Sequence, residues 1–328
     1  MTLKNFGLKT LKRHSERAAS MFFIVFIHIF PMDKPLELTV GVCAYNEEKN
    51  IGELLRQVLD QRMDGVVVRE VLVVSSGSTD RTDEIAGEIA ALDARVRLLP
   101  EPERRGKGFA VNVVLREAAG DIIVLAGADL RLENDTLQKL VKRFMDEKVG
   151  MAGARPVPTN DAGTFPGFCS HLLWELHHRI SLVSPKCGEL IALRNLRYSI
   201  PSDMPVDEAY LEYRCRKDGL KIAYADDSIV RNRGPESVGD YIMQRRRIHA
   251  QHAYLSRKTG FVVSTANLGL VMSSLASSLK PDAKSLCFTA GAVSLEALCG
   301  LLGSYDLYLR GNIYIKWESV ESTKEIKC

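Results

Sequence analysis

The sequence has 328 residues, of which 46% are hydrophobic and 26% charged, and its formal net charge is +3. This composition excludes a disordered or fibrous chain and is typical of a globular protein with one large domain or two small ones. The first 31 residues carry +4 of that charge and the rest about −1, so the body of the chain is not a general binder of nucleic acid.

The cysteines bear on the compartment in which the protein works. Seven are scattered along the chain without a C-x-x-C pair, and their number is odd. Both facts argue against a disulfide framework and favour a reducing, cytoplasmic location.

Residues 1–35 form a basic and apolar extension. The stretch "AASMFFIVFIHIF" has 13 residues without a formal charge, fewer than the roughly 20 that span a bilayer as a helix. Three interpretations stay open: a signal-type segment, an anchor on a membrane surface, or an upstream extension of the reading frame outside the fold, since Met32 directly precedes an orderly domain start. No small-residue cleavage site follows, so we do not expect secretion.

Strands and helices alternate from Leu36 onward. Helices are predicted between the strands, with Asn46 capping the first, Ser78 or Thr79 the second, and Asp135 beginning the fourth, because apolar residues there recur at helical spacing. This alternation predicts an α/β fold with a mainly parallel, doubly wound sheet, whose ligand lies beyond the carboxyl ends of the strands. The expected strands are Leu36–Tyr45, Glu70–Ser76, Arg95–Glu101, Asp121–Gly127 and Val149–Val157.

Polar loops follow the first four strands and are expected to converge on one pocket. Glycines in these loops let backbone amides approach a phosphate, and Lys107 can neutralise an oxygen of a diphosphate. Neither a P-loop motif nor the Rossmann G-x-G-x-x-G follows the first strand, which disfavours both of those folds. The loops are Tyr45–Glu48, Ser75–Asp80, Arg104–Gly108 and Gly127–Asp129.

Five segments, in order, resemble the motifs of family 2 glycosyltransferases with the GT-A fold. They are "GVCAYNEEKNIGELL", "VVSSGSTDRTDEIA", "RRGKGFAVNVVLREAAGDIIVLAGADLRLEND", "VDEAYLEYRCRKDGLKIAYADDSIV" and "QRRRI". The resemblance implies a GT-A domain over residues 36–255, with a nucleotide-sugar half at 36–130 and an acceptor half at 131–255. It also implies transfer of a sugar, with inversion, from a nucleotide-diphosphate sugar to an acceptor.

The resemblance also assigns site residues. The nucleotide-sugar residues would be Ala44, Tyr45, Asn46, Glu48, Ser75, Ser76, Lys107, Ala128 and Asp129. The residues facing the acceptor or the diphosphate would be Glu189, Gln244 and Arg247.

Two departures from the family pattern concern the metal. Ser75 and Ser76 stand where the family usually has two acids, and Gly127 replaces the first acid of the Asp-x-Asp motif. Asp129 keeps the position that usually binds Mn²⁺ or Mg²⁺. Because a charge-assisted contact contributes about 1.5 to 3 kcal/mol, we expect weak metal dependence, or partial replacement of the metal by Lys107 and arginines. The simpler alternative is that Asp129 only caps the turn after the strand.

Asp207 and Glu208 are the candidate catalytic acids. By resemblance, one of them would take the proton from the acceptor hydroxyl as it attacks the anomeric carbon. Counting back from Leu211 favours Glu208, and counting from the preceding proline loop favours Asp207. The plainer alternative is that both acids stabilise a helix amino terminus, and a phosphate acceptor would need no base.

Gln244 and Arg247 match the family's Gln-x-x-Arg-Trp element, with Ile248 in place of Trp. The loss of that Trp favours a single transfer over polymerisation. The alternative is a solvated basic helix face. His249 and His252 nearby are expected to be surface residues rather than metal ligands.

Residues 256–328 are expected to form a helical extension. Phe261–Leu279 has no charge, and Ser285–Leu302 has one, at Glu296. Two such helices would lie in a membrane interface as a hairpin, or pack on the catalytic domain, or pack on a second subunit. A lipid-linked acceptor and a cytoplasmic enzyme held at the membrane surface follow from the first alternative. The aromatic residues from Phe165 to Trp174 are expected to face the core rather than lipid.

Two function hypotheses remain beside each other. The first is the glycosyltransferase. The second is a catalytically degenerate relative that binds a nucleotide or a partner, motivated by Ser75, Ser76 and Gly127. Nucleotidyl transfer is disfavoured, because the basic glycine-rich loop follows the third strand and not the first.

Overall fold

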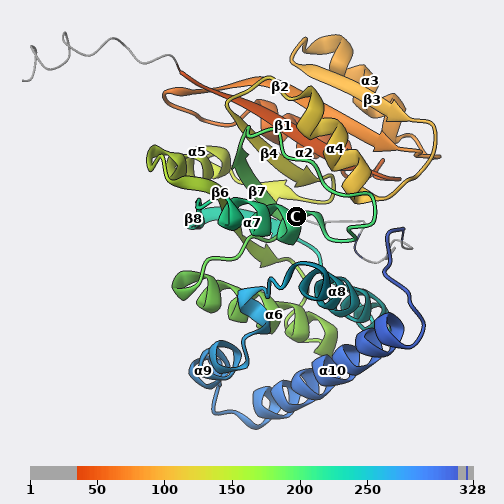
Figure 1. Ribbon diagram of the computed structural model, residues 1–328, viewed down its shortest axis with the longest axis vertical. Helices are drawn as coiled ribbons and strands as arrows, with labels where there is room; N and C mark the ends of the chain where they lie inside the picture. The colour runs from red at the N-terminus through yellow and green to blue at the C-terminus, as the bar shows by residue number, and fades with distance from the viewer. Residues whose placement is uncertain (1–34, 317–322, 324–328) are drawn as a thin grey trace, which may run out of the picture. The chain divides into compact units, whose positions relative to one another are not determined.

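The computed structural model describes residues 35–316 and Thr323. By its internal contacts the chain divides into two units, Met1–Pro35 and Leu36–Cys328. The three interpretations given above for the amino-terminal extension concern residues 1–34, which lie outside the described residues. Figure 1 shows the strands of the second unit gathered into one sheet with helices packed on it.

The sheet has eight strands in the order β3-β2-β1-β4-β7-β6-β8-β5. β1 pairs in parallel with β2 and β4, whereas β7 runs antiparallel to both of its neighbours. The predicted α/β fold of GT-A type, with a mostly parallel sheet and carboxyl-terminal helices, is confirmed. The strands are β1 Leu36–Ala44, β2 Val66–Ser76, β3 Val96–Glu101, β4 Ile122–Gly127, β5 Arg131–Leu132, β6 Val149–Pro158, β7 Leu190–Arg194 and β8 Lys221–Asn232.

Helices alternate with the first strands and continue past the sheet. The helices are α2 Ile51–Leu59, α3 Thr82–Leu92, α4 Lys107–Glu117, α5 Thr136–Val141, α6 Phe165–Val183, α7 Asp207–Lys217, α8 Val238–Thr259, α9 Leu268–Ser278 and α10 Ala283–Tyr308. Two 3₁₀ turns lie at η1 Lys142–Met145 and η2 Ser264–Ala266.

Each face of the sheet buries its own apolar cluster. On one face, alternate residues of β1 such as Val40 and Val42 pack with α2, α3 and α5. On the other face, residues of β2 and β4 pack with α4 and α7. Gly41 of β1 faces Val114 of α4 so closely that a Cβ at that position would overlap the valine side chain. The missing side chain lets α4 approach the sheet, which places Lys107, at the amino end of α4, beside the carboxyl end of β1.

Two predicted helix caps are wrong. α2 begins at Ile51 with Asn50 at the cap position, and α3 begins at Thr82 with Arg81 at the cap position. Asn46 instead has φ 52° and accepts a hydrogen bond from the Thr79 backbone N–H at 2.8 Å. The polar side chains of the two loops bond to each other across the sheet edge, and this competes with capping of their own helices. The helix expected from Asp135 begins one residue later, at Thr136, and α5 is short and continues as a 3₁₀ turn.

The carboxyl-terminal helices pack on the body of the protein. α10 contacts α8 and α6, and α9 contacts α6. Glu296 of α10 accepts hydrogen bonds from Tyr241 at 2.6 Å and from Arg245 at 2.7 Å. Asp306, fully buried, forms an ion pair with Arg246. Both helices thus pack on the catalytic domain and leave apolar side chains of their outer faces exposed.

The two histidines of α8 differ from the expectation. His249 and His252 are half-buried rather than on the surface, and His249 lies against α10 with its Nε2 3.0 Å from Glu296 Oε2. The aromatic segment from Phe165 to Trp174 lies on α6, with its large apolar residues half-buried. α10 is long and apolar enough to cross a membrane, judged by length and composition alone.

Candidate active site

A small cavity lies at the carboxyl ends of β1 and β4. Its walls come from the ends of both strands, the amino ends of α4 and α7, and the residues that lead into β7. Because β7 is antiparallel to β4, its amino end reaches this same edge, where Leu190 pairs with Ala126. The fold therefore brings together predicted site residues from segments far apart in the sequence. The charged residues that line the cavity are Lys107, Glu189, Asp207 and Glu208.

Lys107 is the cationic centre of this cavity. Its Nζ lies 3.1 Å from Asp207 Oδ2 and 3.9 Å from Glu208 Oε2. Partial loss of hydration works against the charge of the lysine, but the two carboxylates outweigh it and hold the pKa of Lys107 above its usual value. Lys107 is therefore charged, and it stands at the amino end of α4, where the backbone adds positive potential.

Asp207 and Glu208 are the first two residues of α7 and share one hydrogen bond. Burial and the charge of Glu208 raise the pKa of Asp207, although Lys107 opposes this. Burial opposes ionisation of Glu208 as well, but Lys107 and the hydrogen bond from Asp207 lower its pKa overall. Of the two, Asp207 therefore binds a proton more readily, and Glu208 ionises first. The Glu208 side chain is also the more accessible, at 25% exposed against 7%.

Asp129 and Glu189 place further negative charge at the cavity. Glu189 is accessible at its mouth, yet loss of hydration and the charge of Asp129 raise its pKa to about 7. The Asn232 amide donates to Glu189 Oε1 at 3.3 Å. These carboxylates repel one another, and a divalent cation would relieve that repulsion, so the site fits a hard metal ion with oxygen ligands.

Gly127, in place of the first acid of the metal motif, leaves space that the Asp129 carboxylate occupies. A Cβ at residue 127 would lie 2.5 Å from Asp129 Oδ1. The Asp129 carboxylate thus occupies the space beside Gly127, and a side chain there would displace it. Within the residues that the structure describes, no group of three or more His, Cys, Asp or Glu side chains is arranged to hold a metal. Asp129 would therefore share a metal with oxygens of the bound donor.

Arg247 of α8 approaches the acidic side of the site. Loss of hydration lowers the pKa of its guanidinium to about 10, while the charges of Glu208 and Glu189 act in the opposite direction. The predicted Gln244 lies on the same helix, one turn earlier. Neither α8 residue is part of the cavity wall itself.

Hydrogen bonds join the predicted nucleotide-binding residues of the first two loops to each other at one edge of the sheet. The Arg104 guanidinium lies over the Tyr45 ring at 4.0 Å from its centroid. The Asn46 backbone N–H donates to Ser78 Oγ at 3.1 Å, and Ser75 Oγ donates to the same atom at 2.8 Å.

The other predicted residues of this edge lie close by. Glu48 Oε2 accepts from the Arg81 backbone N–H at 3.1 Å. Ala44 ends β1, and the Ala128 backbone N–H donates to the carbonyl of Cys43 at 3.3 Å. Ala128 and Asp129 therefore stand beside the end of β1.

Glu101 is a site residue that the sequence did not reveal. It ends β3 opposite Ser76 in the strand register. Ser76 Oγ donates to Glu101 Oε2 at 2.8 Å, and Arg105 donates to Glu101 Oε1 at 2.7 Å. The neighbouring strand thus places a buried carboxylate beside Ser76. Only the alignment of the ends of β2 and β3, and no local motif, could have indicated that Glu101 lies there.

The chain after α10 returns to the same edge. The Ile315 carbonyl oxygen lies 2.6 Å from the position that a Cβ of Gly106 would take, and Gly106 has φ 108°. Gln251 of α8 donates to the Tyr314 carbonyl at 3.0 Å. Tyr314 and Ile315 therefore form a wall beside the loop that carries Lys107, a contact that no pattern in the sequence predicts.

Comparison with known proteins agrees with this geometry. The structure is similar to a mannosyltransferase from Pyrobaculum calidifontis solved in complex with GDP-Man and Mn²⁺, with a TM-score of 0.57 and 23% identity, over 93% of this chain and 96% of that one. The fold is that of a GT-A glycosyltransferase domain. Residues 39–201 match the model of glycosyl transferase family 2, and the chain belongs to this family.

Curated relatives share only part of their length with this chain. The dolichyl-phosphate beta-glucosyltransferase ALG5C of Trichomonas vaginalis is 26% identical over 182 residues, which are 50% of this chain and 54% of that protein. The human dolichyl-phosphate beta-glucosyltransferase is 31% identical over 117 residues, 34% of this chain and 36% of that protein. The chain spans about half or less of these relatives.

Proposed function

We propose that this protein transfers a sugar, with inversion, from a nucleotide-diphosphate donor to a phosphate-bearing lipid at a membrane surface. The observation that carries the proposal is the convergence of Lys107, Asp129, Glu189 and the Asp207–Glu208 pair at the carboxyl edge of β1 and β4. A cation at a helix amino end is suited to a diphosphate, and the acids are suited to a metal and to an acceptor.

On the donor side, Lys107 and the backbone N–H groups that begin α4 would bind the diphosphate. Asp129, with Glu189 nearby, would hold Mn²⁺ or Mg²⁺, which would neutralise charge on the leaving nucleoside diphosphate. The loops with Tyr45 and Ser75 would surround the nucleoside. The Ser76–Glu101 contact adds a hydrogen-bond acceptor to that part of the site.

On the acceptor side, we assign the base role to Glu208. Its pKa is lowered and its side chain is more accessible than that of Asp207, which binds a proton more readily and lies 3.1 Å from Lys107 Nζ. With a hydroxyl acceptor, Glu208 would take the proton as the oxygen attacks the anomeric carbon and the diphosphate leaves from the opposite face. A phosphate acceptor is already ionised. Glu208 then positions Arg247, whose guanidinium would bind the acceptor phosphate.

Two observations favour a lipid phosphate as the acceptor. The two curated relatives described above are named as dolichyl-phosphate glucosyltransferases. The chain also presents apolar residues to solvent on α9 and α10, including Leu268 and Leu301. Both point to a substrate that is delivered from a membrane.

The experiment incubates the full chain with radiolabelled UDP-glucose or GDP-mannose, Mn²⁺ and a polyprenyl phosphate, and measures label in the lipid extract. We expect transfer from one donor, and we expect Asp129→Asn to lower it by about tenfold or more. Asp60→Asn, an exposed aspartate just after α2, is the matched control and should keep full activity.

Two outcomes would contradict this proposal. Label transferred only to hydroxyl acceptors would exclude the lipid phosphate. A donor-induced rise in melting temperature without any transfer would instead support the degenerate nucleotide-binding relative.

A further inference from the structure

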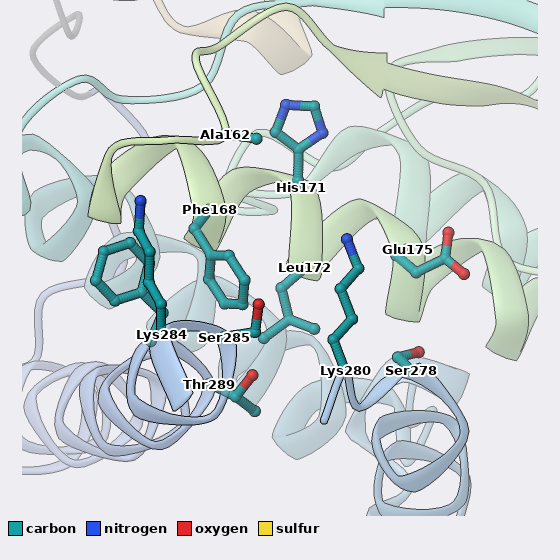
Figure 2. Close-up of a pocket in the computed structure, with 11 residues that line it drawn as sticks. Ala162, Phe168, His171, Leu172, Glu175, Ser278, Lys280, Lys284, Ser285 and Thr289 are labelled. Carbon is teal, nitrogen blue, oxygen red and sulfur yellow. The ribbon is translucent and has the colours of Figure 1, made fainter. Parts of the chain in front are cut away.

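A groove separate from the candidate active site lies between α6, α9 and α10 (Figure 2). It encloses about 330 Å³, the lower end of the range for small-molecule sites. Phe168 and Leu172 of α6 and Phe288 of α10 supply its apolar surface. Phe288 meets the Phe168 ring edge-on at 5.4 Å between centroids. The groove therefore offers an apolar floor of fixed shape.

Basic side chains line the same groove. Figure 2 shows Lys280, from the connection between α9 and α10, and Lys284, from the first turn of α10, at the groove with His171 of α6. Lys284 Nζ donates to the Gly163 carbonyl at 3.1 Å and lies 5.3 Å from the centroid of the Phe288 ring. These contacts hold the ammonium beside the apolar floor.

The acids near the groove are engaged elsewhere. Glu175 accepts from Arg179 at 2.6 Å, and Asp282 accepts from the Ser285 backbone N–H at 2.9 Å as the cap of α10. Asp282 keeps its charge near Lys280. Among the residues that line the groove, however, the two lysines outnumber Glu175, whose charge Arg179 balances, so the lining is net positive. A ligand with an anionic group and an apolar part would match both of its surfaces.

α9, α10 and the turn between them expose several large apolar side chains. Met272 and Leu279 are 54% and 48% exposed, and Leu286 and Val293 of α10 are each 45% exposed. Monomeric soluble proteins rarely expose large contiguous apolar patches without a partner. Apolar helices with lysines at their ends are typical of elements that lie in a membrane interface.

A second copy of the chain fits this surface less well than a bilayer. In a two-fold symmetric contact both copies bring the same patch, so a contact centred on Lys280 and Lys284 would gather four lysines at one interface. An anionic membrane brings the opposite charge to the same place.

We propose that this groove binds the phosphate headgroup of an anionic membrane phospholipid. Lys280 and Lys284 contact the phosphate, and an acyl chain lies along Phe168, Leu172 and Phe288. α9 and α10 then rest in the headgroup region. The site is distinct from the acceptor site, because none of the residues that line the groove also lines the active-site cavity. The inference goes beyond glycosyl transfer and does not depend on it.

The test measures binding of the full chain to vesicles of phosphatidylcholine alone and to vesicles with about one fifth phosphatidylglycerol. Because each lysine near an anionic surface contributes about 1 kcal/mol, Lys280→Ala/Lys284→Ala should weaken binding to the anionic vesicles by about 30-fold. The matched control is Lys142→Ala/Lys148→Ala, which removes the same charge from exposed positions away from the groove. It should bind as the unchanged protein does.

Three results would overturn the proposal. One is equal loss in both double variants, which would mean only a general charge effect. Another is equal binding of the unchanged protein to both kinds of vesicle, which would mean that the apolar surface alone acts. The third is a rise in melting temperature with inorganic phosphate alone, lost in Lys280→Ala/Lys284→Ala, together with no preference for anionic vesicles, which would identify a free-phosphate site.

A melting-temperature titration with UDP and GDP on each variant is the internal check. An unchanged nucleotide response in Lys280→Ala/Lys284→Ala shows that the protein is folded. It also separates failure of lipid binding from failure of the proposed glycosyl transfer.

Discussion

The sheet and the carboxyl-terminal helices are held in place by different means. The sheet is sealed on both faces by apolar clusters of fully buried aliphatic side chains. Within the described part of the chain, the buried apolar cluster between α6, α8 and α10 is small, with Cys169, Tyr241 and Ala292, and ion pairs join α8 to α10. Apolar packing tolerates small shifts, whereas paired charges fix one register between two helices. The helices can therefore leave an apolar face outward without losing their place on the body.

α8 connects the two regions. Arg245 and Arg246 bond to acids of α10, while Arg247, the next residue, lies near Glu208 and Glu189. The position of Arg247 at the acceptor side thus depends on the pairing of its neighbours with α10. Removal of one of these ion pairs tests whether charge, rather than apolar packing, holds α10 on α8.

Asp306→Asn should have the largest effect on stability. Asp306 is fully buried and bonds to both Arg246 and Tyr314. Loss of one partner of a buried pair costs roughly 3 kcal/mol or more of unfolding free energy. Urea denaturation of the variant measures this cost. Asp64→Asn, at an exposed position, should change it by less than about 0.5 kcal/mol. Equal values for the two variants would mean that α10 is held by packing alone.

Lys107→Met tests the sheet side and should act on function more than on folding. The change removes the charge between Asp207 and Glu208 and the expected contact with the diphosphate. A charge-assisted contact of about 1.5 to 3 kcal/mol corresponds to a roughly tenfold to 100-fold fall in kcat/KM. Lys139→Met, on α5, is the control, because its lysine pairs with an exposed aspartate. Unchanged transfer in Lys107→Met would exclude Lys107 from the donor site.

The pH dependence of stability should be the smallest effect. The folded-state pKa of Glu189 is raised to about 7, above its unfolded value. The folded protein therefore binds the extra proton, and its contribution to stability is complete below the unfolded pKa and is lost as pH rises toward 7. Asp207 acts in the same direction.

Melting temperatures of the nucleotide-free protein at pH 5 and pH 8 measure this contribution. Glu189→Gln should reduce the fall between the two values without abolishing it. Mn²⁺ should raise the melting temperature more at pH 8 than at pH 5, since ionised carboxylates bind it. No difference between the protein and the variant would mean that Glu189 keeps an ordinary pKa.

The sequence predicted the sheet better than it predicted the contacts between distant segments. The first four strands are runs of mostly apolar, β-forming residues and their helices repeat apolar residues at helical spacing, and the structure has them near the expected positions. β8 was not predicted as a strand in its own right, because its pairing with β6 shifts register and Asp226 and Asp227 interrupt its apolar pattern. Asn46 was misassigned because its side chain bonds across to the next loop, and sequence alone does not show which loops meet.

The same limit applies to the site. Motifs located Lys107, Asp129, Asp207 and Glu208, since each follows or begins a recognisable element. The position of Glu101 beside Ser76 depends on the register of β2 and β3, and the position of Tyr314 depends on where the chain returns after α10. Long-range pairings of this kind arise from the fold as a whole, and no local pattern encodes them.

The contact between Ile315 and Gly106 has a practical consequence for anyone shortening this protein. A truncation that removes α10 together with the residues after it, chosen to obtain a more soluble preparation, would also remove the main-chain neighbour of the loop that carries Lys107. Loss of nucleotide response in such a truncated protein would then reflect an altered donor loop and not a need for the membrane. Substitution of Lys280 and Lys284 leaves the contact between Ile315 and Gly106 in place. These variants therefore test membrane attachment without altering the donor loop, whereas a deletion would change both.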